Sequence, residues 1–227
     1  VRYSCPLWIV ESFLKDYGIE DAKALLEESL KPAPTVLRIN NARADISEIE
    51  KEYEIKDNSI ELTKGMDITN SELYKKGFVY AQDYASQKVV EVLNPKAGDR
   101  VLDVCAAPGG KSFTMANLMG NKGEILACDL YPHRVELIRK TAKRLGLDII
   151  KTAVADATGY NPEFGEFDCI LCDVPCSGLG VIRRKPEIKY NALPQLEELK
   201  NIQLSILRNA VKYLKKGGKL LYSTCTL

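Results

Sequence analysis

Short apolar runs alternate with helix-type periodicity along the chain from Val101 onward. The runs are rich in β-branched residues, Leu and Cys and lack a clean polar alternation, which is typical of strands covered on both faces. We predict strands at Val101–Ala106, Glu124–Asp129, Ile150–Ala155, Phe167–Asp173 and Lys219–Thr226. We predict helices near Lys111–Met119, Pro132–Leu145 and Pro194–Leu214, the last ended by Gly217-Gly218. Strict alternation of strand and helix predicts an α/β fold with a parallel, doubly wound sheet.

The first part of the chain has a different pattern, with shorter elements and more frequent turn residues. It predicts helices at Pro6–Tyr17 and Glu20–Leu30, a helix opening at Asp45, strands at Thr35–Asn40, Ser59–Leu62 and Phe78–Gln82, and a helix at Tyr84–Leu93. We therefore predict a small α+β subdomain over residues 1–78 and a sheet domain over residues 79–227. The fifth predicted strand of that domain ends next to Leu227 and leaves a sheet edge uncovered, so we expect the natural protein to continue.

Composition narrows the class of protein. With 227 residues, 45% of them hydrophobic and 28% charged, the chain is typical of an ordinary globular protein, which excludes collagen-like and disordered classes. It has neither an apolar run of ~18 residues nor a signal-peptide pattern, so we expect a cytoplasmic protein that does not bind a membrane. Residues 1–90 carry 12 basic and 16 acidic side chains, whereas residues 91–227 carry 20 and 15. This difference favours the second part as the partner of a polyanion.

The segment after the first predicted strand of the sheet has the residues of a ligand-binding loop. It reads Asp103-Val-Cys105-Ala-Ala-Pro108-Gly109-Gly110-Lys111-Ser112 and opens a helix. A phosphate-binding P-loop would need Gly at the position of Cys105, and a dinucleotide fingerprint would need a third glycine. Neither pattern is therefore complete.

Acidic residues end four consecutive predicted strands: Asp103, Asp129, Asp156 and Asp173. Ligands of such sheets lie outside the carboxyl ends of the strands, so we expect these acids to meet at one crevice. Asp129 is placed to accept hydrogen bonds from ribose hydroxyls, and Asp156 to reach an adenine amino group. The set predicts a nucleoside-sized site.

Two of the seven cysteines lie at strand ends, Cys176 within Asp173-Val-Pro-Cys-Ser-Gly and Cys225 within Ser-Thr-Cys-Thr. If their strands are neighbours, two thiols and the Asp173 carboxylate come together, which favours covalent chemistry. The remaining cysteines lie in or near apolar strands and are interpreted as small core residues: Cys5, Cys105, Cys128, Cys169 and Cys172. The odd count and the absence of export signals predict reduced thiols. No metal site is expected.

These motifs, in this order and spacing, resemble those of the RNA (cytosine-5)-methyltransferases that use S-adenosylmethionine. The match rests on Asp103-x-Cys-Ala-Ala-Pro-Gly-Gly-Lys111, on Asp173-x-Pro-Cys176-Ser-Gly and on Thr224-Cys225. The opening Pro6-Leu-Trp8-Ile-Val-Glu and the stretch from Gly178 to Lys189 look like the branch that methylates bacterial small-subunit ribosomal RNA. The resemblance implies a Rossmann-like class I methyltransferase that methylates cytosine carbon 5 in 16S ribosomal RNA.

The resemblance also implies roles for individual residues. Cys225 matches the nucleophile that adds to cytosine carbon 6, Cys176 the thiol that assists product release, and Asp173 the acid that contacts the cytosine. The cofactor-binding positions that match are Cys105, Ala106, Ala107, Pro108, Gly109, Gly110, Lys111, Asp129, Arg134, Asp156 and Asp173.

The basic residues just beyond the Cys176 loop are candidates for RNA phosphate contacts: Arg183, Arg184, Lys185 and Lys189. We expect a monomer whose partner is small-subunit ribosomal RNA. Two other functions remain open at this point. A nucleotide hydrolase would use Lys111 on phosphates and Asp173 as a magnesium ligand, and a non-catalytic RNA-binding module would carry a vestigial cofactor pocket.

Overall fold

The computed structural model describes residues 2–62, 67–190 and 193–226. They form two compact units. The first unit combines residues 1–33, 175–202 and 224–227, and the second combines residues 34–174 and 203–223. Residues 1–33 and 34–78, expected in one small subdomain, thus lie in different units, and the boundary at residue 78 stays a prediction. No helix among the described residues is both long enough and apolar enough to cross a membrane.

A five-stranded sheet forms the centre of the second unit, as the sequence predicts. Its order is β7-β6-β5-β8-β9, and every neighbouring pair is parallel. The strands are β5 (Arg100–Asp103), β6 (Glu124–Asp129), β7 (Ile150–Val154), β8 (Phe167–Asp173) and β9 (Leu214–Ser223). The central strands β5 and β8 are almost wholly buried, whereas the edge strand β7 is not. Apolar runs without alternation therefore mark strands packed on both faces.

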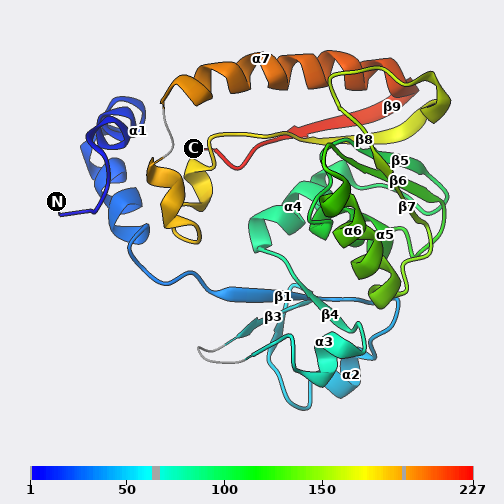
Figure 1. Cartoon of the computed structure of the whole chain (residues 1–227). Coiled ribbons are helices and arrows are strands. Elements are labelled where there is room, and N and C mark those ends of the chain that lie inside the picture. The colour runs from blue at the N-terminus through cyan, green and yellow to red at the C-terminus, as the bar shows by residue number, and fades with distance from the viewer. Residues whose placement is uncertain (1, 63–66, 191–192, 227) are drawn as a thin grey trace. The chain divides into compact units, whose positions relative to one another are not determined.

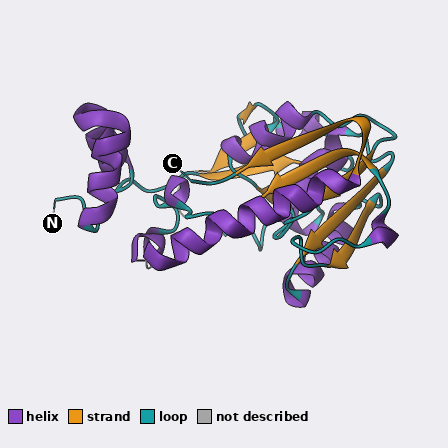
Figure 2. Cartoon of the chain, turned by 90° about the horizontal axis from the view of Figure 1, so that it is seen from above, coloured by secondary structure: helices purple, strands orange, loops and turns teal. Residues whose placement is uncertain are grey.

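Helices cover both faces of this sheet (Figure 2). On one face lie α4 (Tyr84–Leu93), α5 (Gly110–Leu118) and α6 (Pro132–Leu145), whose buried side chains form one core with β5, β6 and β8. On the other face Ile206 and Ala210 of α7 (Leu193–Ala210), together with Tyr213, form a second core with Leu102 and Ile170. This two-faced covering is the doubly wound arrangement that the alternating pattern predicts.

The last helix ends earlier than its apolar stripe suggests. α7 ends at Ala210, a short 3-10 turn η4 (Val211–Tyr213) follows, and β9 begins at Leu214, before the two glycines. Phe167 pairs with Leu214, but Cys169 pairs with Lys219. Over this stretch β9 therefore contains more residues than β8, and the register between the two strands shifts. The prediction that Gly217-Gly218 ends the helix was wrong, because these glycines lie inside a bulged strand.

A small antiparallel sheet belongs to the same unit (Figure 1). Its order is β2-β3-β1-β4, and its elements are β1 (Thr35–Ile39), α2 (Ile46–Ile49), β2 (Ile55–Lys56), β3 (Ser59–Leu62), α3 (Glu72–Lys75) and β4 (Val79–Ala81). The side chain of Asn40, with no exposed surface, donates hydrogen bonds to the carbonyls of Gly77 (2.8 Å) and Leu145 (2.7 Å). The buried amide thus ties the small sheet to the end of α6.

The first unit is built around the helical segment α1 (Leu7–Glu28). Gly18 has non-helical backbone angles (φ 75°, ψ 177°) and divides the segment into two helices, as predicted. Ile9, Phe13 and Leu26 pack with Leu179 and Ile182, which lie on and directly after the 3-10 turn η2 (Leu179–Val181). The segment after β8 therefore shares a core with the amino-terminal helices. A further short turn, η3 (Pro186–Tyr190), follows, and η1 (Pro162–Phe164) precedes β8.

Candidate active site

The loop between β5 and α5 turns sharply so that the amino end of α5 faces a hollow. Gly109 has φ +106°, and a Cβ there would lie 2.3 Å from the ring of Phe113. Phe113 is 2% exposed and has no room to retreat. Only glycine therefore fits at this turn, which explains the first of the two adjacent glycines.

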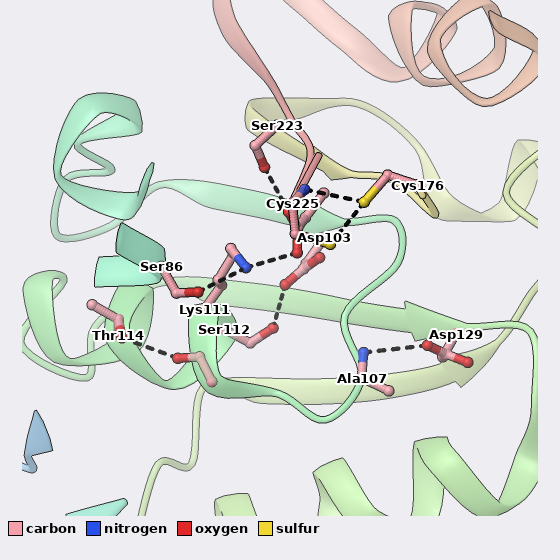
Figure 3. A network of polar contacts seen from close by, with 12 residues as sticks. Ser86, Asp103, Ala107, Lys111, Ser112, Thr114, Asp129, Cys176, Ser223 and Cys225 are labelled. Carbon is pink, nitrogen blue, oxygen red and sulfur yellow. Dashed lines mark hydrogen bonds and ion pairs between the residues drawn. The ribbon is translucent and has the colours of Figure 1, made fainter. Parts of the chain in front are cut away.

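Asp103, the last residue of β5, is buried under this loop. It is 1% exposed, and its Oδ2 accepts a hydrogen bond of 2.6 Å from the hydroxyl of Ser112 (Figure 3). Its Oδ1 has no hydrogen-bond partner among the described residues. Burial is the largest cause that raises the Asp103 pKa to about 7, and the nearby charge of Asp173 acts in the same direction. The sequence pattern placed Asp103 at the crevice but assigned it no role.

Asp129, the last residue of β6, holds the loop from the side. Its Oδ2 accepts a hydrogen bond of 3.2 Å from the backbone N–H of Ala107 (Figure 3), and its Oδ1 lies 3.3 Å from the guanidinium of Arg134. Arg134 also donates to the carbonyl oxygen of Ala107 at 3.0 Å. The structure therefore brings both predicted residues to the loop, where they support its backbone.

Asp156 lies after β7 and is exposed. Its carboxylate accepts hydrogen bonds from the backbone N–H (2.9 Å) and the hydroxyl (2.7 Å) of Thr158, and these bonds lower the Asp156 pKa. A small hollow next to it is lined by Ala155, Ala157 and Tyr213, among others. A carboxylate has about four acceptor positions, so Asp156 keeps acceptor capacity beyond its own turn.

Lys111 and Asp173 form an ion pair beside the same loop. The ammonium of Lys111 lies 2.7 Å from Oδ2 of Asp173. It also lies 3.4 Å from the hydroxyl of Ser86 (Figure 3). The hydroxyl of Ser223, at the end of β9, donates to Oδ1 of Asp173 at 2.7 Å. Both carboxylate oxygens are thus held, which fixes the orientation of Asp173.

These groups line a cavity of about 180 Å³, whose walls come from residues 81–86, residues 103–111 and Asp173. The wall from residues 81–86, at the end of β4 and the start of α4, is absent from the predicted site. It includes Gln82, which is 7% exposed and whose Nε2 has no hydrogen-bond partner among the described residues. The sequence signal for this wall was the pair of polar residues Gln82-Asp83, at which a predicted strand ends.

The two cysteines at the strand ends lie together in the first unit. The Sγ atoms of Cys176 and Cys225 are 2.7 Å apart, and the backbone N–H of Cys225 points to the sulfur of Cys176 at 3.2 Å (Figure 3). Cys225 is exposed and Cys176 is half-buried, and neither forms a disulfide. Because β8 and β9 are parallel neighbours, their end loops bring the two thiols together, as expected from their order in the sequence.

The other five cysteines have the surroundings of structural residues. Burial raises the pKa of Cys128 and of Cys172 to about 12 and that of Cys169 to about 11, and it also raises the pKa values of Cys5 and Cys105. A thiol with a raised pKa stays protonated and is a poor nucleophile near neutral pH.

The four basic residues proposed to contact RNA are in different environments. The guanidinium of Arg183 donates to the carbonyls of Pro32 (2.7 Å) and Lys31 and pairs with Glu28 at 3.0 Å. Lys189 is 3% exposed, and its ammonium lies 3.3 Å from the hydroxyl of Ser29. Arg183 and Lys189 thus tie η3 and its preceding turn to the end of α1. In contrast, Arg184 and Lys185 are exposed, and an RNA contact stays a prediction for them.

Two family models match the chain. The model described as 16S rRNA methyltransferase RsmB/F matches residues 90–227. A second model, described as the ferredoxin-like domain of RsmF/B-like methyltransferases, matches residues 5–77.

Individual relatives agree with these matches. The probable ribosomal RNA small subunit methyltransferase B of Bacillus subtilis (strain 168) is 44% identical over 237 residues, which cover 99% of this chain and 53% of that protein. The tRNA (cytosine(72)-C(5))-methyltransferase of Pyrococcus horikoshii is 39% identical over 156 residues, which cover 68% of this chain and 39% of that protein. A crystal structure of a methyltransferase homologue from Pyrococcus horikoshii superposes with a TM-score of 0.86 at 28% identity and covers 100% of this chain and 75% of that one. The chain spans about half the length of its ribosomal RNA methyltransferase relatives.

Proposed function

Because the chain belongs to the RsmB/F family of 16S rRNA methyltransferases, we propose that it transfers a methyl group from S-adenosylmethionine to carbon 5 of a cytosine in small-subunit ribosomal RNA. The reaction would pass through a covalent bond between Cys225 and carbon 6 of the base. The observation that carries this proposal is the pair of sulfurs of Cys176 and Cys225, 2.7 Å apart after two neighbouring strands.

The residues around the β5 loop fit the proposed cofactor. Two buried polar atoms without partners among the described residues, Oδ1 of Asp103 and Nε2 of Gln82, belong to side chains that line the cavity. Such atoms are available for hydrogen bonds to a polar ligand. S-adenosylmethionine would supply an electrophilic methyl group on its sulfonium. Residues 105–111 would surround the methionine part of the cofactor, which we infer from the walls of the cavity and from the family resemblance.

The remaining parts of the cofactor would be bound by the acids of the next two strand ends. Asp129 keeps acceptor capacity for ribose hydroxyls while it holds the N–H of Ala107, and Arg134 keeps Asp129 in place. Asp156 would accept a hydrogen bond from the adenine amino group.

Carbon 5 of cytosine is a poor nucleophile, and the proposed chemistry of the chain overcomes this. The thiolate of Cys225 would add to carbon 6, while Asp173 stabilises a proton at ring nitrogen 3. Carbon 5 then has enamine character and accepts the methyl group. Lys111 and Ser223, which hold the two oxygens of Asp173, would keep its carboxyl group in one orientation during the addition.

Product release requires the loss of the proton on carbon 5 and of the sulfur on carbon 6. Cys176 would take the carbon 5 proton as a base, and the electron pair left behind would expel the thiolate of Cys225. The half-buried position of Cys176 against the sulfur of Cys225 supports this division of roles.

A base inside an RNA helix does not reach such a site unless it leaves the stack. The substrate would therefore be an unpaired or extruded cytosine. The exposed side chains of Arg184 and Lys185, which follow Cys176 in the sequence, would contact RNA phosphates.

A trapping experiment tests the covalent mechanism. With unmodified small-subunit RNA and tritium-labelled S-adenosylmethionine, Cys176→Ala is expected to accumulate a protein–RNA adduct on denaturing gels, because addition proceeds without release. Cys225→Ala is expected to give neither adduct nor methylated RNA. An adduct that forms in Cys225→Ala and disappears in Cys176→Ala would reverse the two roles, and the absence of methyl transfer by the unaltered chain would contradict the proposed activity.

A binding titration separates this proposal from nucleotide hydrolysis. The ammonium of Lys111 is already neutralised by Asp173, so the chain is expected to bind S-adenosylhomocysteine and not ATP. Binding of ATP without binding of S-adenosylhomocysteine would favour a hydrolase.

A further inference from the structure

We propose that Cys176 and Cys225 form a reversible disulfide with each other, which makes this pair a redox modification site. The two sulfurs are 2.7 Å apart. A disulfide bond is ~2.05 Å long, so the bond needs only a sub-ångström approach of the two sulfurs. Both residues belong to the same compact unit.

The backbone around the two cysteines holds them together. The N–H of Gly180 donates to the carbonyl of Cys225 at 2.9 Å, and the hydroxyls of Ser177 and Thr226 share a short hydrogen bond. A Cβ on Gly180 would lie 2.8 Å from the same Cys225 oxygen, so the two segments approach as closely as a glycine allows. The second thiol is therefore present at a high effective concentration when the first one reacts.

Access to solvent distinguishes Cys225 from the other six cysteines. Cys225 is exposed to solvent, whereas Cys128, Cys169 and Cys172 are buried. Burial keeps those three thiols protonated, as described above. An oxidant in solution would therefore meet Cys225 first.

The reaction is a thiol–disulfide exchange with a low-molecular-weight disulfide such as glutathione disulfide. The thiolate of Cys225 attacks one sulfur of the oxidant, whose sulfur–sulfur bond breaks and releases one thiolate, and a mixed disulfide remains on Cys225. The thiolate of Cys176 then attacks Sγ of Cys225 and displaces the second small thiolate. The two protein sulfurs are oxidised, the oxidant is reduced to two thiols, and the protons of the two cysteines end on those thiols.

The consequence for activity rests on the proposed function. A sulfur bonded to another sulfur is not a thiolate and does not add to carbon 6 of cytosine, so the oxidised chain would form no RNA adduct. A dithiol reductant would restore both thiols and with them the reaction. The site would thus make methyl transfer depend on the thiol–disulfide balance of its surroundings.

The experiment treats the whole chain with glutathione disulfide, blocks the remaining thiols with iodoacetamide under denaturing conditions, and maps the products by mass spectrometry. Two of the seven cysteines are expected to escape alkylation, in a single Cys176–Cys225 cross-linked peptide that dithiothreitol cleaves. Cys176→Ser and Cys225→Ser are expected to form no intramolecular bond. Cys5→Ser, which removes a half-buried thiol from the same unit, is expected to keep the bond. Circular dichroism verifies that each variant is folded.

The mass measurement uses neither RNA nor cofactor, so it separates this inference from the proposed function. A stable mixed disulfide on Cys225 with Cys176 still open to alkylation, or a cross-link between other cysteines, would overturn the inference. If the bond forms but the reduced chain transfers no methyl group, the proposed function fails and the modification site stands. If the cross-linked chain methylates RNA as fast as the reduced chain, the claim that the bond stops the reaction is wrong.

Discussion

The loop after β5 and the two segments that carry Cys176 and Cys225 both follow parallel strands, yet they are built in opposite ways. The β5 loop is held by buried groups: Asp103 and Asp129 are 1% and 3% exposed, and Gly109 packs against a buried ring. The cysteine pair is held by backbone hydrogen bonds near the surface, and Cys225 is exposed. Substitutions in the β5 loop should therefore alter folding and binding together, whereas substitutions of the cysteines should alter the chemistry alone.

The largest effect is expected for Cys225→Ala. Removal of a covalent nucleophile is expected to reduce the rate of methyl transfer by roughly 10⁴-fold or more. Because the side chain is exposed, the free energy of unfolding should change by less than ~0.5 kcal/mol. Single-turnover transfer of labelled methyl groups and urea denaturation measure the two quantities. A large loss of stability in this variant would remove the contrast between the two regions.

Gly109→Ala is expected to have the next largest effect, and on stability. The positive φ costs roughly 1 kcal/mol for a residue with a Cβ, and the clash with the buried Phe113 adds roughly 1–3 kcal/mol. Affinity for S-adenosylhomocysteine should fall as well, because the loop has to move. Gly98→Ala is the matched control: its φ is +94°, but nothing lies within 4 Å of the added Cβ. Equal losses of stability in the two variants, measured by urea denaturation, would show that the packing against Phe113 is unimportant.

Asp103→Asn is expected to change how stability depends on pH. The folded-state pKa is raised from 3.8 to about 7, so between these values the folded chain holds a proton that the unfolded chain has lost. Stability therefore falls as pH rises, by about 2 kcal/mol between about pH 5.5 and about pH 8. In Asp103→Asn the neutral amide does not titrate, so this fall in stability with rising pH should disappear.

The control for this pH dependence is Asp156→Asn. The pKa of the exposed Asp156 is lowered from its usual value, so its contribution to stability is lost only on acidification. Urea denaturation across the pH range should give the same slope for this variant as for the unaltered chain. If Asp103→Asn leaves the slope unchanged too, the buried carboxyl is not the group that titrates.

Much of the arrangement of the β5 loop and of the two cysteine segments could be predicted from the sequence, because the residues that end parallel strands meet at one edge of the sheet. Apolar runs without alternation predicted the central strands. The positions of Cys176 and Cys225 at the ends of two strands expected to be neighbours predicted that their sulfurs would lie together. The wall around Gln82 was missed because it comes from a segment before β5, and only the tertiary packing brings it to the loop. The end of the last helix was misplaced because an apolar stripe does not distinguish a helix from the turn and strand that continue it.

The burial of Lys189 could not be predicted from the sequence either. Four basic side chains within seven residues indicate a charged surface, but η3 turns one of them inward against Ser29. A short 3-10 turn has no amphipathic period long enough to reveal which face is buried. The structure therefore separates side chains that the sequence grouped together.

The smallest effect is expected for Lys185→Gln, and Lys189→Gln is its counterpart. Lys185 is exposed, so its loss should remove one phosphate contact: affinity for single-stranded RNA falls a few-fold, and the slope of log affinity against log salt becomes shallower by about 0.7. Stability should not change. Lys189 is 3% exposed and bonded to Ser29, so Lys189→Gln should lower the free energy of unfolding and leave the salt slope unaltered. Fluorescence anisotropy at several salt concentrations, combined with urea denaturation, measures both. If Lys185→Gln leaves the salt slope unchanged, Lys185 makes no phosphate contact and the RNA surface lies elsewhere; if Lys189→Gln changes the slope, the ammonium of Lys189 reaches the RNA in spite of its burial.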